Sequence, residues 1–296
     1  MVVVTYNHVR FLQQALDSVV AQRTERPIEI IISEDCSTDG TTEIAAAFAE
    51  QEGRAQLILS PRNLRSNEVV LRAVRAASGR YLCLLDGDDY WTSPSKLEEQ
   101  ASVLDNDPRL SACFHNALIV RGDALSDDRW TPGGQPARVT FDDIWYGNPF
   151  ATCAGMLRAS ALVDLDDWYR HFFPITDWPL YVLCAEHGDL AFHDEVVGAY
   201  RLHDGGEFTS LPTQRQVDAI ARFYRLMDGA LGGRAHHSAS AGASRFFFDR
   251  AVEHAERGDR RLARACVGHS LRCGGVGRSV GRRQWLRLAW RLRGRT

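Results

Sequence analysis

The fold is decided by residues 1–33, which read MVVVTYNHVRFLQQALDSVVAQRTERPIEIIIS. Two short runs rich in β-branched residues, 2–5 and 29–33, are bounded by residues typical of turns. Between these runs, apolar residues recur at helical spacing: Phe11, Leu12, Ala15, Leu16, Val19 and Val20. A strand, an amphipathic helix and a second strand in this order predict a β-α-β unit.

The same alternation continues along the chain. It predicts helices at about 41–51, 67–77, 94–104 and 177–187, and strands at 56–60, 81–85, 111–119, 152–157 and 196–201. A loop rich in Gly, Pro and Asp is expected at 122–137. Alternating strands and helices predict an α/β fold with a mostly parallel central sheet flanked by helices, and ligands bind such folds at the carboxyl ends of the strands.

The chain is expected to have a main domain at 1–230, a linker at 231–243 and a helical C-terminal extension at 244–296. Residues 231–243 have the small and polar composition of a linker. The extension shows the pattern of a helix pair interrupted at Gly258-Asp259, which resembles one unit of a helical repeat. One such unit cannot bury its apolar faces alone, so we expect it to pack on the main domain or to form a homodimer with a second copy.

The composition is that of an ordinary globular protein, with 45% hydrophobic and 25% charged residues in a chain of 296. Its apolar runs are far shorter than the roughly 20 residues of a membrane-spanning helix. The first residues lack the pattern of a secretory leader, so a cytoplasmic location is expected. Seven cysteines are scattered without a C-x-x-C pair, which favours free, buried thiols over disulfides or a zinc site.

Charge is distributed unevenly along the chain. Residues 277–296 hold seven arginines and no acidic residue, although the net charge of the whole chain is −3. This tail could be a basic amphipathic helix in peripheral contact with a membrane, or a helix packed on the extension with a solvated arginine face; the second is favoured. Nucleic-acid binding is not expected, because the rest of the chain is acidic. Lys96 is the single lysine.

Three acidic clusters follow predicted strands or precede a predicted helix. The first, residues 33–41, contains Asp35; taken alone, it is better explained as a polar loop that caps the next helix. The second, residues 84–91, has three carboxylates within four residues, which repel one another unless a cation lies between them; its alternative is a solvated turn. The third, residues 174–180, contains Asp177, either a helix N-cap or a catalytic base.

Common enzyme signatures are missing from the sequence. It contains no G-x-x-x-x-G-K-[ST] loop, and the glycines at 274–281 do not have the dinucleotide-binding spacing. It also lacks H-E-x-x-H and G-x-S-x-G. These absences argue against a P-loop NTPase, a dehydrogenase of the Rossmann type, and the commonest zinc proteases and serine hydrolases.

Five motifs, taken in order, resemble the motif series of family 2 glycosyltransferases with the GT-A fold. They are Val3-Val4-Thr5-Tyr6-Asn7, the stretch EDCSTDGT at 34–41, Asp86-Gly87-Asp88-Asp89, Thr176-Asp177-Trp178 and Tyr200-Arg201-Leu202-His203. The resemblance covers about residues 1–205. It implies an inverting transferase that uses a nucleotide-diphosphate sugar, most often a UDP-sugar, with Mn²⁺ or Mg²⁺.

The resemblance also implies a role for each matching residue. Thr5, Tyr6 and Asn7 would line the nucleotide pocket, and Asp35 would hydrogen-bond the base. Asp86 would lie near the ribose and the metal, while Asp88 and His203 would bind the metal. Asp177 would be the catalytic base. Thr176 departs from the glutamate that many relatives carry before this aspartate, which leaves the hydrogen bonds on the acceptor side undefined.

The acceptor is not specified by the sequence and could be a saccharide, a lipid, a peptide or a small natural product. We expect 122–150, 158–176 and the C-terminal helices to form the acceptor side. Two other functions stay open from the residues alone: a catalytically inactive binding or assembly module of the same fold, and a nucleotidyltransferase, which would release pyrophosphate in place of a nucleoside diphosphate.

Overall fold

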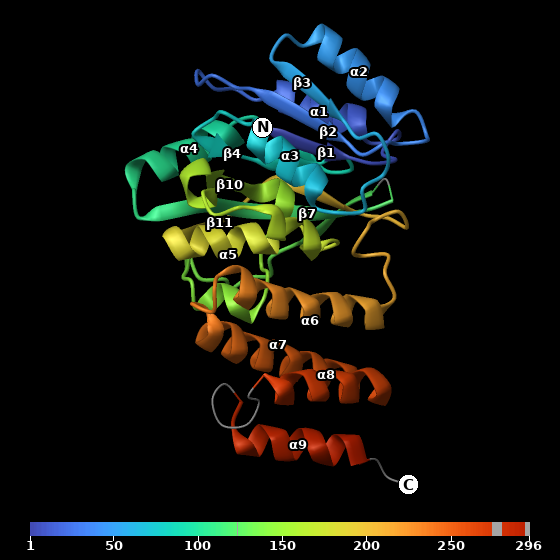
Figure 1. Ribbon diagram of the computed structural model, residues 1–296, viewed down its shortest axis with the longest axis vertical. Coiled ribbons are helices and arrows are strands. Elements are labelled where there is room, and N and C mark those ends of the chain that lie inside the picture. Colours follow the sequence, from blue (N-terminus) through green and yellow to red (C-terminus); the bar gives the residue numbers. More distant parts are fainter. Residues whose placement is uncertain (123, 274–279, 294–296) are drawn as a thin grey trace. The chain divides into compact units, whose positions relative to one another are not determined.

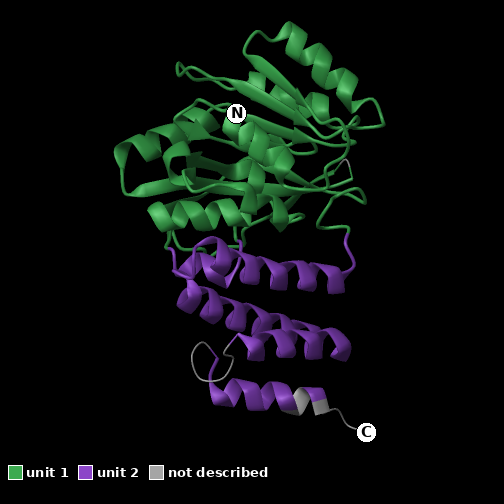
Figure 2. Cartoon of the chain, in the orientation of Figure 1, with its two compact units in different colours: residues 1–140, 149–210 green, residues 141–148, 211–296 purple. Residues whose placement is uncertain are grey.

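The computed structural model describes residues 1–122, 124–273 and 280–293, which form two compact units (Figures 1 and 2). Unit 1 comprises residues 1–140 and 149–210. Unit 2 comprises residues 141–148 and 211–296. Unit 1 therefore contains every residue that the sequence predicts for the site.

Unit 1 begins with a fully parallel sheet of four strands. Its order is β3 (Ala55–Leu59), β2 (Ile30–Glu34), β1 (Val2–Thr5) and β5 (Leu84–Asp86). The connecting helices are α1 (Leu12–Val20), α2 (Thr41–Gln51) and α3 (Glu68–Ala76). The predicted β-α-β unit is confirmed, and α1 packs on the sheet through Leu12, Ala15, Leu16 and Val19, all buried at a spacing of three or four residues.

The second sheet is mixed, contrary to the expected parallel continuation. Its order is β4 (Tyr81–Leu82), β10 (Gly155–Arg158), β7 (Leu110–Arg121), β11 (Asp189–Leu202) and β6 (Tyr90–Trp91). In this sheet only β7 and β11, among the described residues, run parallel, while β8 (Ala124–Arg129) and β9 (Arg138–Val139) add antiparallel pairs. Strand β8 lies where a loop was predicted. Antiparallel neighbours need no crossover helix, so the β-α-β pattern stops here.

The strand predicted at 81–85 is in fact two strands that belong to different sheets. Strand β4 pairs with β10, while β5 pairs with β1. The residue between them, Cys83, accepts a hydrogen bond from the backbone N–H of Val2 at 2.9 Å. Residues 152–157 likewise divide into a 3-10 turn (η2, Thr152–Ala154) and the start of β10. The chain thus passes from one sheet to the other directly before the acidic turn at 86–89.

Helices α4 (Lys96–Asn106) and α5 (Trp178–His187) complete unit 1, with short 3-10 segments η3 (Ala159–Leu162) and η4 (Asp167–Phe172) between β10 and α5. Five of the seven cysteines are buried and two are half-buried, all as free thiols, as expected.

Lys96 is completely buried at the start of α4 and cannot reach a substrate phosphate. Its Nζ donates to Gln100 Oε1 at 2.7 Å and to the carbonyl of Gly155 at 3.1 Å, and it lies 4.5 Å from the centre of the Trp91 ring. Burial lowers the pKa of this amine. The single lysine therefore joins α4 to β10 and β6.

Lys96→Met is expected to lower the free energy of unfolding by about 2–6 kcal/mol. The substitution keeps the volume but leaves two buried acceptors, on Gln100 and Gly155, without their donor, and each such group costs about 1–3 kcal/mol. Urea unfolding followed by circular dichroism measures the change. The matched control is Arg62→Met at an exposed position, which is expected to stay within about 0.5 kcal/mol of the parent. Equal stability of Lys96→Met and the parent would contradict the prediction.

Unit 2 is helical. It contains η1 (Asp143–Tyr146), α6 (Thr213–Ala230), α7 (His236–Glu256), α8 (Arg260–Arg272) and α9 (Arg282–Arg293). Helices α7 and α8 are the predicted pair, and the break between them falls at Gly258-Asp259, where Gly258 has a φ of 82° and Asp259 caps α8.

The linker predicted at 231–243 is largely wrong, because α7 begins at His236. The small residues of this segment serve helix packing instead of chain flexibility. A Cβ on Gly242 would lie 2.4 Å from the carbonyl oxygen of Trp145, so only glycine allows α7 to contact η1 this closely. The first unit also ends at residue 210 and not at 230, because α6 groups with the other C-terminal helices.

The arginine-rich tail packs on unit 2 over its described part. Trp285 of α9 contacts Phe248 of α7, with ring centres 5.0 Å apart, and Leu288 is 2% exposed. Arg282, Arg283 and Arg287 are exposed. This arrangement agrees with the packed-helix interpretation. Residues 277–279 and 294–296 of the predicted tail lie outside the described residues.

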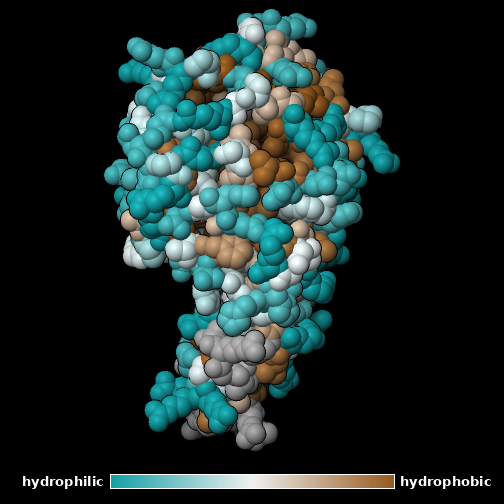
Figure 3. Space-filling view, turned by 60° about the vertical axis from the view of Figure 1, so that its left-hand side comes forward, coloured by the Kyte–Doolittle hydropathy of each residue, from teal (hydrophilic) through white to brown (hydrophobic). Residues whose placement is uncertain are grey.

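No helix among the described residues is both long enough and apolar enough to cross a membrane. Hydrophilic side chains cover most of the face in Figure 3, with an apolar hollow in its upper part.

Candidate active site

The carboxyl ends of β1, β2 and β5 lie at one edge of the parallel sheet. Val4 of β1 is in register with Ser33 of β2 on one side and with Asp86 of β5 on the other. The residues that follow each strand, including Asp35 and Gly87, therefore meet at this edge, as the fold class predicts.

The loop after β2 is held by its own side chains. Glu34 is 1% exposed, and its carboxylate accepts from the N–H groups of Cys36 at 3.0 Å and Ser37 at 2.6 Å. Asp39 accepts from Thr41 N–H at 3.0 Å before α2 begins, which confirms that part of the loop supports the helix start. Asn7 is exposed, with a φ of 55° that asparagine tolerates, and its Oδ1 accepts from Thr38 N–H at 2.8 Å. Its side chain thus joins the β1 loop to the β2 loop.

Asp35 lies at the base of this edge and is 6% exposed. Both of its carboxylate oxygens accept from the N–H of Leu64, at 3.1 and 3.0 Å. Burial raises the pKa of Asp35 in spite of these hydrogen bonds. Tyr6 is half-buried, and Thr5 is 1% exposed with its carbonyl accepting from Asp35 N–H at 3.0 Å.

The three carboxylates of the acidic turn have different surroundings. Asp89 is 1% exposed, and its Oδ1 accepts from the N–H of Arg201 on β11 at 2.8 Å. Burial raises the pKa of Asp89, and the neighbouring Asp88 and Asp86 raise it further. The guanidinium of Arg201 donates to the carbonyl of Asp88 at 2.5 Å. Asp89 and Arg201 therefore fix the turn against β11.

Asp88 faces two histidines. His203 Nε2 lies 2.9 Å from Asp88 Oδ2, and His8 Nε2 lies 3.7 Å from the same oxygen. Burial alone would raise the pKa of Asp88, but His8 and the hydrogen bond with His203 outweigh burial and hold this pKa below its usual value. Burial lowers the pKa of His8, which favours its neutral form. The predicted pair of Asp88 and His203 is brought together, and sequence reasoning missed His8, whose only signal is its place directly after the β1 loop.

Gly87 permits this close packing. A Cβ at this position would lie 2.6 Å from Thr5 Oγ1 and 2.9 Å from His8 Nδ1, nearer than side-chain carbons pack. The glycine between Asp86 and Asp88 therefore allows Thr5 and His8 to lie directly against the acidic turn.

Gly87→Ala is expected to lower the free energy of unfolding by about 1–3 kcal/mol, because the added methyl group overpacks the contact with Thr5 and His8. Urea denaturation measures this. Gly53→Ala is the matched control: nothing lies within 4 Å of its added Cβ, so stability should be retained or raised by up to about 1 kcal/mol. Equal changes in the free energy of unfolding for Gly87→Ala and Gly53→Ala would show that the close packing at Gly87 does not constrain the side chain there.

Asp177 caps α5 and also faces the acidic turn. Its Oδ1 accepts from Trp178 N–H at 2.7 Å at the start of the helix. Burial raises the pKa of Asp86 well above its ordinary value, and Asp88, Asp177 and Glu207 raise it further. The charge of Asp177 at the start of α5 is therefore one cause of the raised pKa of Asp86 in the turn. The capping and site interpretations of Asp177 are therefore compatible.

Glu207 adds a further carboxyl group that sequence reasoning missed. It belongs to the segment after His203, and the residue as a whole is exposed. Protein atoms nevertheless surround its carboxyl group. This partial burial, together with the charges of Asp35 and Asp88, raises the pKa of Glu207 to about 7, while the charge of Arg65 lowers it.

The donor set around Asp88 fits a divalent cation. Asp88 Oδ2 lies 2.9 Å from one imidazole nitrogen and 3.7 Å from another, and further carboxylates lie close enough to raise the pKa of Asp86 and Asp89. A cation would relieve this repulsion. Oxygen and imidazole ligands together suit Mn²⁺ better than Mg²⁺, which prefers oxygen alone.

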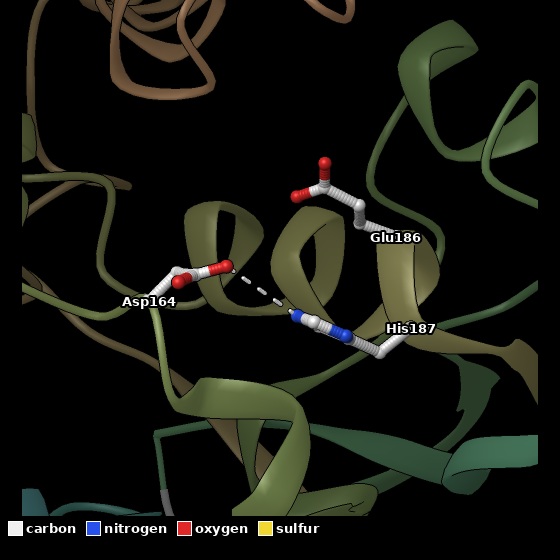
Figure 4. Close-up of side chains that lie close together, drawn as sticks. All are labelled: Asp164, Glu186 and His187. Atoms are coloured by element: carbon white, nitrogen blue, oxygen red, sulfur yellow. Dashed lines mark ion pairs between the residues drawn. The ribbon is translucent and has the colours of Figure 1, made fainter.

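A second group of possible ligands lies elsewhere in unit 1. Ligand atoms of Asp164, Glu186 and His187 lie within 4.8 Å of one another, and Asp164 Oδ2 forms an ion pair with His187 Nε2 at 3.7 Å (Figure 4). Asp164 and His187 are exposed, and exposed acidic groups are common without a metal. We assign no metal to this group.

An apolar pocket of about 500 Å³ lies at the opposite end of the strands. It is lined by residues that include Met1, Ile28, Leu97, Ala101 and Met156. The nearby carboxylate of Glu29 accepts from the N–H groups of Ser78 and Gly79, both at 2.7 Å. Because none of the predicted site residues lines this pocket, the acidic edge remains the candidate site.

The chain is similar to known proteins in both sequence and fold. Residues 1–162, more than half of the chain, match the family model described as "Glycosyl transferase family 2". Protein Rv1520 of Mycobacterium tuberculosis is 34% identical over 217 residues, which cover 73% of this chain. The match spans only 62% of that relative's length.

Two solved structures resemble the chain at low sequence identity. Residues 1–349 of S. aureus TarS in complex with UDP-GlcNAc align with a TM-score of 0.60 and 16% identity, covering 92% of this chain and 91% of TarS 1–349. Mannosyltransferase PcManGT from Pyrobaculum calidifontis, in complex with GDP-Man and Mn²⁺, aligns with a TM-score of 0.54 and 17% identity, covering 98% and 83%. These likenesses show that the chain has the GT-A fold. Together with the family match, they lead to one conclusion: the chain belongs to glycosyltransferase family 2.

Proposed function

We propose that the chain is an inverting, metal-dependent transferase that moves a sugar from a nucleotide-diphosphate donor to an acceptor hydroxyl. The observation that carries the proposal is the convergence of carboxylates from separate parts of the chain on one edge of the sheet. Asp35 follows β2, Asp86 and Asp88 flank the end of β5, and Asp177 begins α5.

Asp35 and Tyr6 would hold the nucleotide, with Asp86 near the ribose. Asp35 suits this role because its position is fixed by Leu64 and Thr5 while its carboxylate keeps further acceptor sites. The TarS structure contains UDP-GlcNAc and the PcManGT structure contains GDP-Man, which supports a nucleotide-diphosphate sugar as the donor. We favour a UDP-sugar. Thr5 and Asn7 would act mainly by supporting these loops, because their polar atoms contact His8 and Thr38.

Asp88 and His203 would hold the divalent cation, Mn²⁺ or Mg²⁺. When bound, such an ion stabilises the negative charge that develops on the leaving diphosphate. The PcManGT complex contains Mn²⁺, in support of this assignment. The single lysine is buried in α4 and cannot supply this charge.

Asp177 would be the general base. It would take the proton of the acceptor hydroxyl while the acceptor oxygen bonds to the anomeric carbon and the bond from that carbon to the diphosphate oxygen breaks. Attack opposite to the leaving group inverts the anomeric configuration. The hydrogen bond from the N–H of Trp178 would hold the carboxylate of Asp177 in place at the start of α5.

We also propose that the chain divides into a catalytic unit and a helical extension. The acceptor could be a saccharide, a lipid, a peptide or a small natural product. A homodimer through the C-terminal helices and membrane contact through 277–296 are measurable by light scattering and by liposome pelleting of the full chain against a 1–276 truncation.

A thermal-shift panel of UDP-, TDP-, GDP- and CMP-sugars, each with and without Mn²⁺, tests the proposed function. A donor at 100 times its Kd stabilises the folded chain by about 2.7 kcal/mol, so the correct donor should raise the Tm selectively, and only with Mn²⁺ to the full extent. Release of a nucleoside diphosphate from that donor would then identify the reaction. A flat panel across all donors would contradict the proposal.

A further inference from the structure

We propose that His8 is a ligand of the divalent cation, so that Asp88, His203 and His8 together supply one oxygen and two nitrogen atoms. This proposal rests on the proposed function, which places a cation beside Asp88. It adds a residue that lies outside the motifs by which the sequence resembles its family.

His8 lies near the same carboxylate oxygen of Asp88 as His203. Its Nε2 points at the same oxygen of Asp88 as the Nε2 of His203, at 3.7 and 2.9 Å. The two rings lie edge to face with centres 6.4 Å apart. The His8 side chain is 15% exposed and that of His203 is 20% exposed, so both rings are accessible to a small ion but confined.

The Nδ1 atoms of the two histidines have different hydrogen-bond partners. His203 Nδ1 accepts from the N–H of Gly205 at 3.2 Å, so its neutral ring carries its proton on Nε2 and donates to Asp88. To bind a cation through Nε2, His203 must give up the Gly205 hydrogen bond. His8 has no such conflict. Its Nδ1 lies 3.3 Å from Thr5 Oγ1, a hydroxyl that can accept as well as donate.

With the proton on Nδ1, His8 would present the lone pair of Nε2 toward Asp88. A metal-binding histidine typically donates its other N–H in this way, which fixes the ring and its tautomer. Without a cation, this lone pair would face a carboxylate oxygen, an unfavourable arrangement that a cation between them would reverse.

The residues around His8 hold its ring against the acidic turn. Thr5 is 1% exposed, and the absence of a side chain at Gly87 lets Thr5 and His8 lie against the acidic turn. His8 is therefore held in place from the β1 side of the site, whereas His203 is held from the β11 side. A cation bound by both would connect the parallel sheet to the mixed sheet.

Mn²⁺ titration followed by electron paramagnetic resonance, on the full chain with and without UDP, tests this assignment. Loss of outer-shell partners already costs about 10–100-fold in metal affinity, so His8→Ala is expected to weaken Mn²⁺ binding at least tenfold. His203→Ala should have a similar effect. His171→Ala, at an exposed position in η4, is the matched control and should bind Mn²⁺ as the parent does. His8→Phe retains an aromatic ring without nitrogen and should also lose affinity if His8→Ala does not fold.

The nitrogen couplings in pulsed spectra of bound Mn²⁺ should report two imidazoles in the parent chain and one in the His8 variants. Equal Mn²⁺ affinity of parent and His8→Ala would overturn the proposal while leaving the proposed function intact. An effect of His8→Ala on UDP binding without Mn²⁺, with Mn²⁺ affinity unchanged, would also overturn it and assign His8 to the phosphates. Failure of the parent chain to bind Mn²⁺ with UDP would overturn the metal dependence of the proposed function as well.

Discussion

Asp177→Asn is expected to slow sugar transfer by about 10²–10⁴-fold while donor affinity stays unchanged. An amide has nearly the shape of the carboxylate but cannot take the acceptor's proton, and a positioned general base contributes a factor of this size. The amide oxygen can still accept from Trp178 N–H, so the start of α5 is preserved. The expected result is therefore a loss of kcat without a loss of donor binding.

Nucleoside diphosphate release with the donor found in the thermal-shift panel measures turnover, and calorimetry measures the donor Kd. Asp107→Asn is the matched control, since Asp107 also accepts from a backbone N–H, that of Arg109 at 3.0 Å, and lies outside the proposed donor and acceptor sites. This control should retain full turnover. Full turnover in Asp177→Asn would remove Asp177 from the role of base and would leave the donor site untouched.

Asp88→Ala is expected to abolish the Mn²⁺-dependent part of donor binding. The substitution removes the carboxylate that both His8 and His203 face, and with it the negative charge that attracts the cation. A donor at a concentration of 100 times its Kd stabilises the parent chain by about 2.7 kcal/mol. A variant that no longer binds the donor would lose this stabilisation. The Tm shift produced by donor and Mn²⁺ together should therefore disappear.

The same Tm measurements without ligand check that Asp88→Ala folds. Asp128→Ala, an exposed aspartate on β8 whose side chain is 66% accessible, is the matched control and should keep the full shift. Equal donor affinity of Asp88→Ala and the parent in Mn²⁺ would show that the acidic turn does not bind the cation. The GT-A fold would be unaffected by that outcome.

Both predictions concern residues that the sequence analysis singled out. Asp88 and Asp177 were both predicted from their motifs, and in the structure the charges of both raise the pKa of Asp86. His8 and Glu207 were not predicted, because a single histidine or glutamate in a loop carries no pattern. Asp89 is equally acidic in sequence, yet its bond to Arg201, 112 residues away, makes it a support of the turn.

The β-α-β start, the parallel sheet and the place of the candidate site at its edge could be predicted from the amino-acid sequence. These features are readable because they rest on local periodicity: residues at helical spacing face the sheet, and parallel strands end on the same side. The break between α7 and α8 was readable for the same reason, since Gly258 and the capping Asp259 act within one turn of the chain.

The other features depend on contacts between segments that are far apart in the sequence. The division of residues 81–86 between two sheets depends on pairing with β1 and β10, which lie far away in the sequence. The segment read as a linker is helical because η1 offers a surface that only small residues can approach. His8 joins the site because Gly87 leaves room for its ring. Each of these outcomes depends on contacts between distant segments, and local propensity holds no information about which partner will be present.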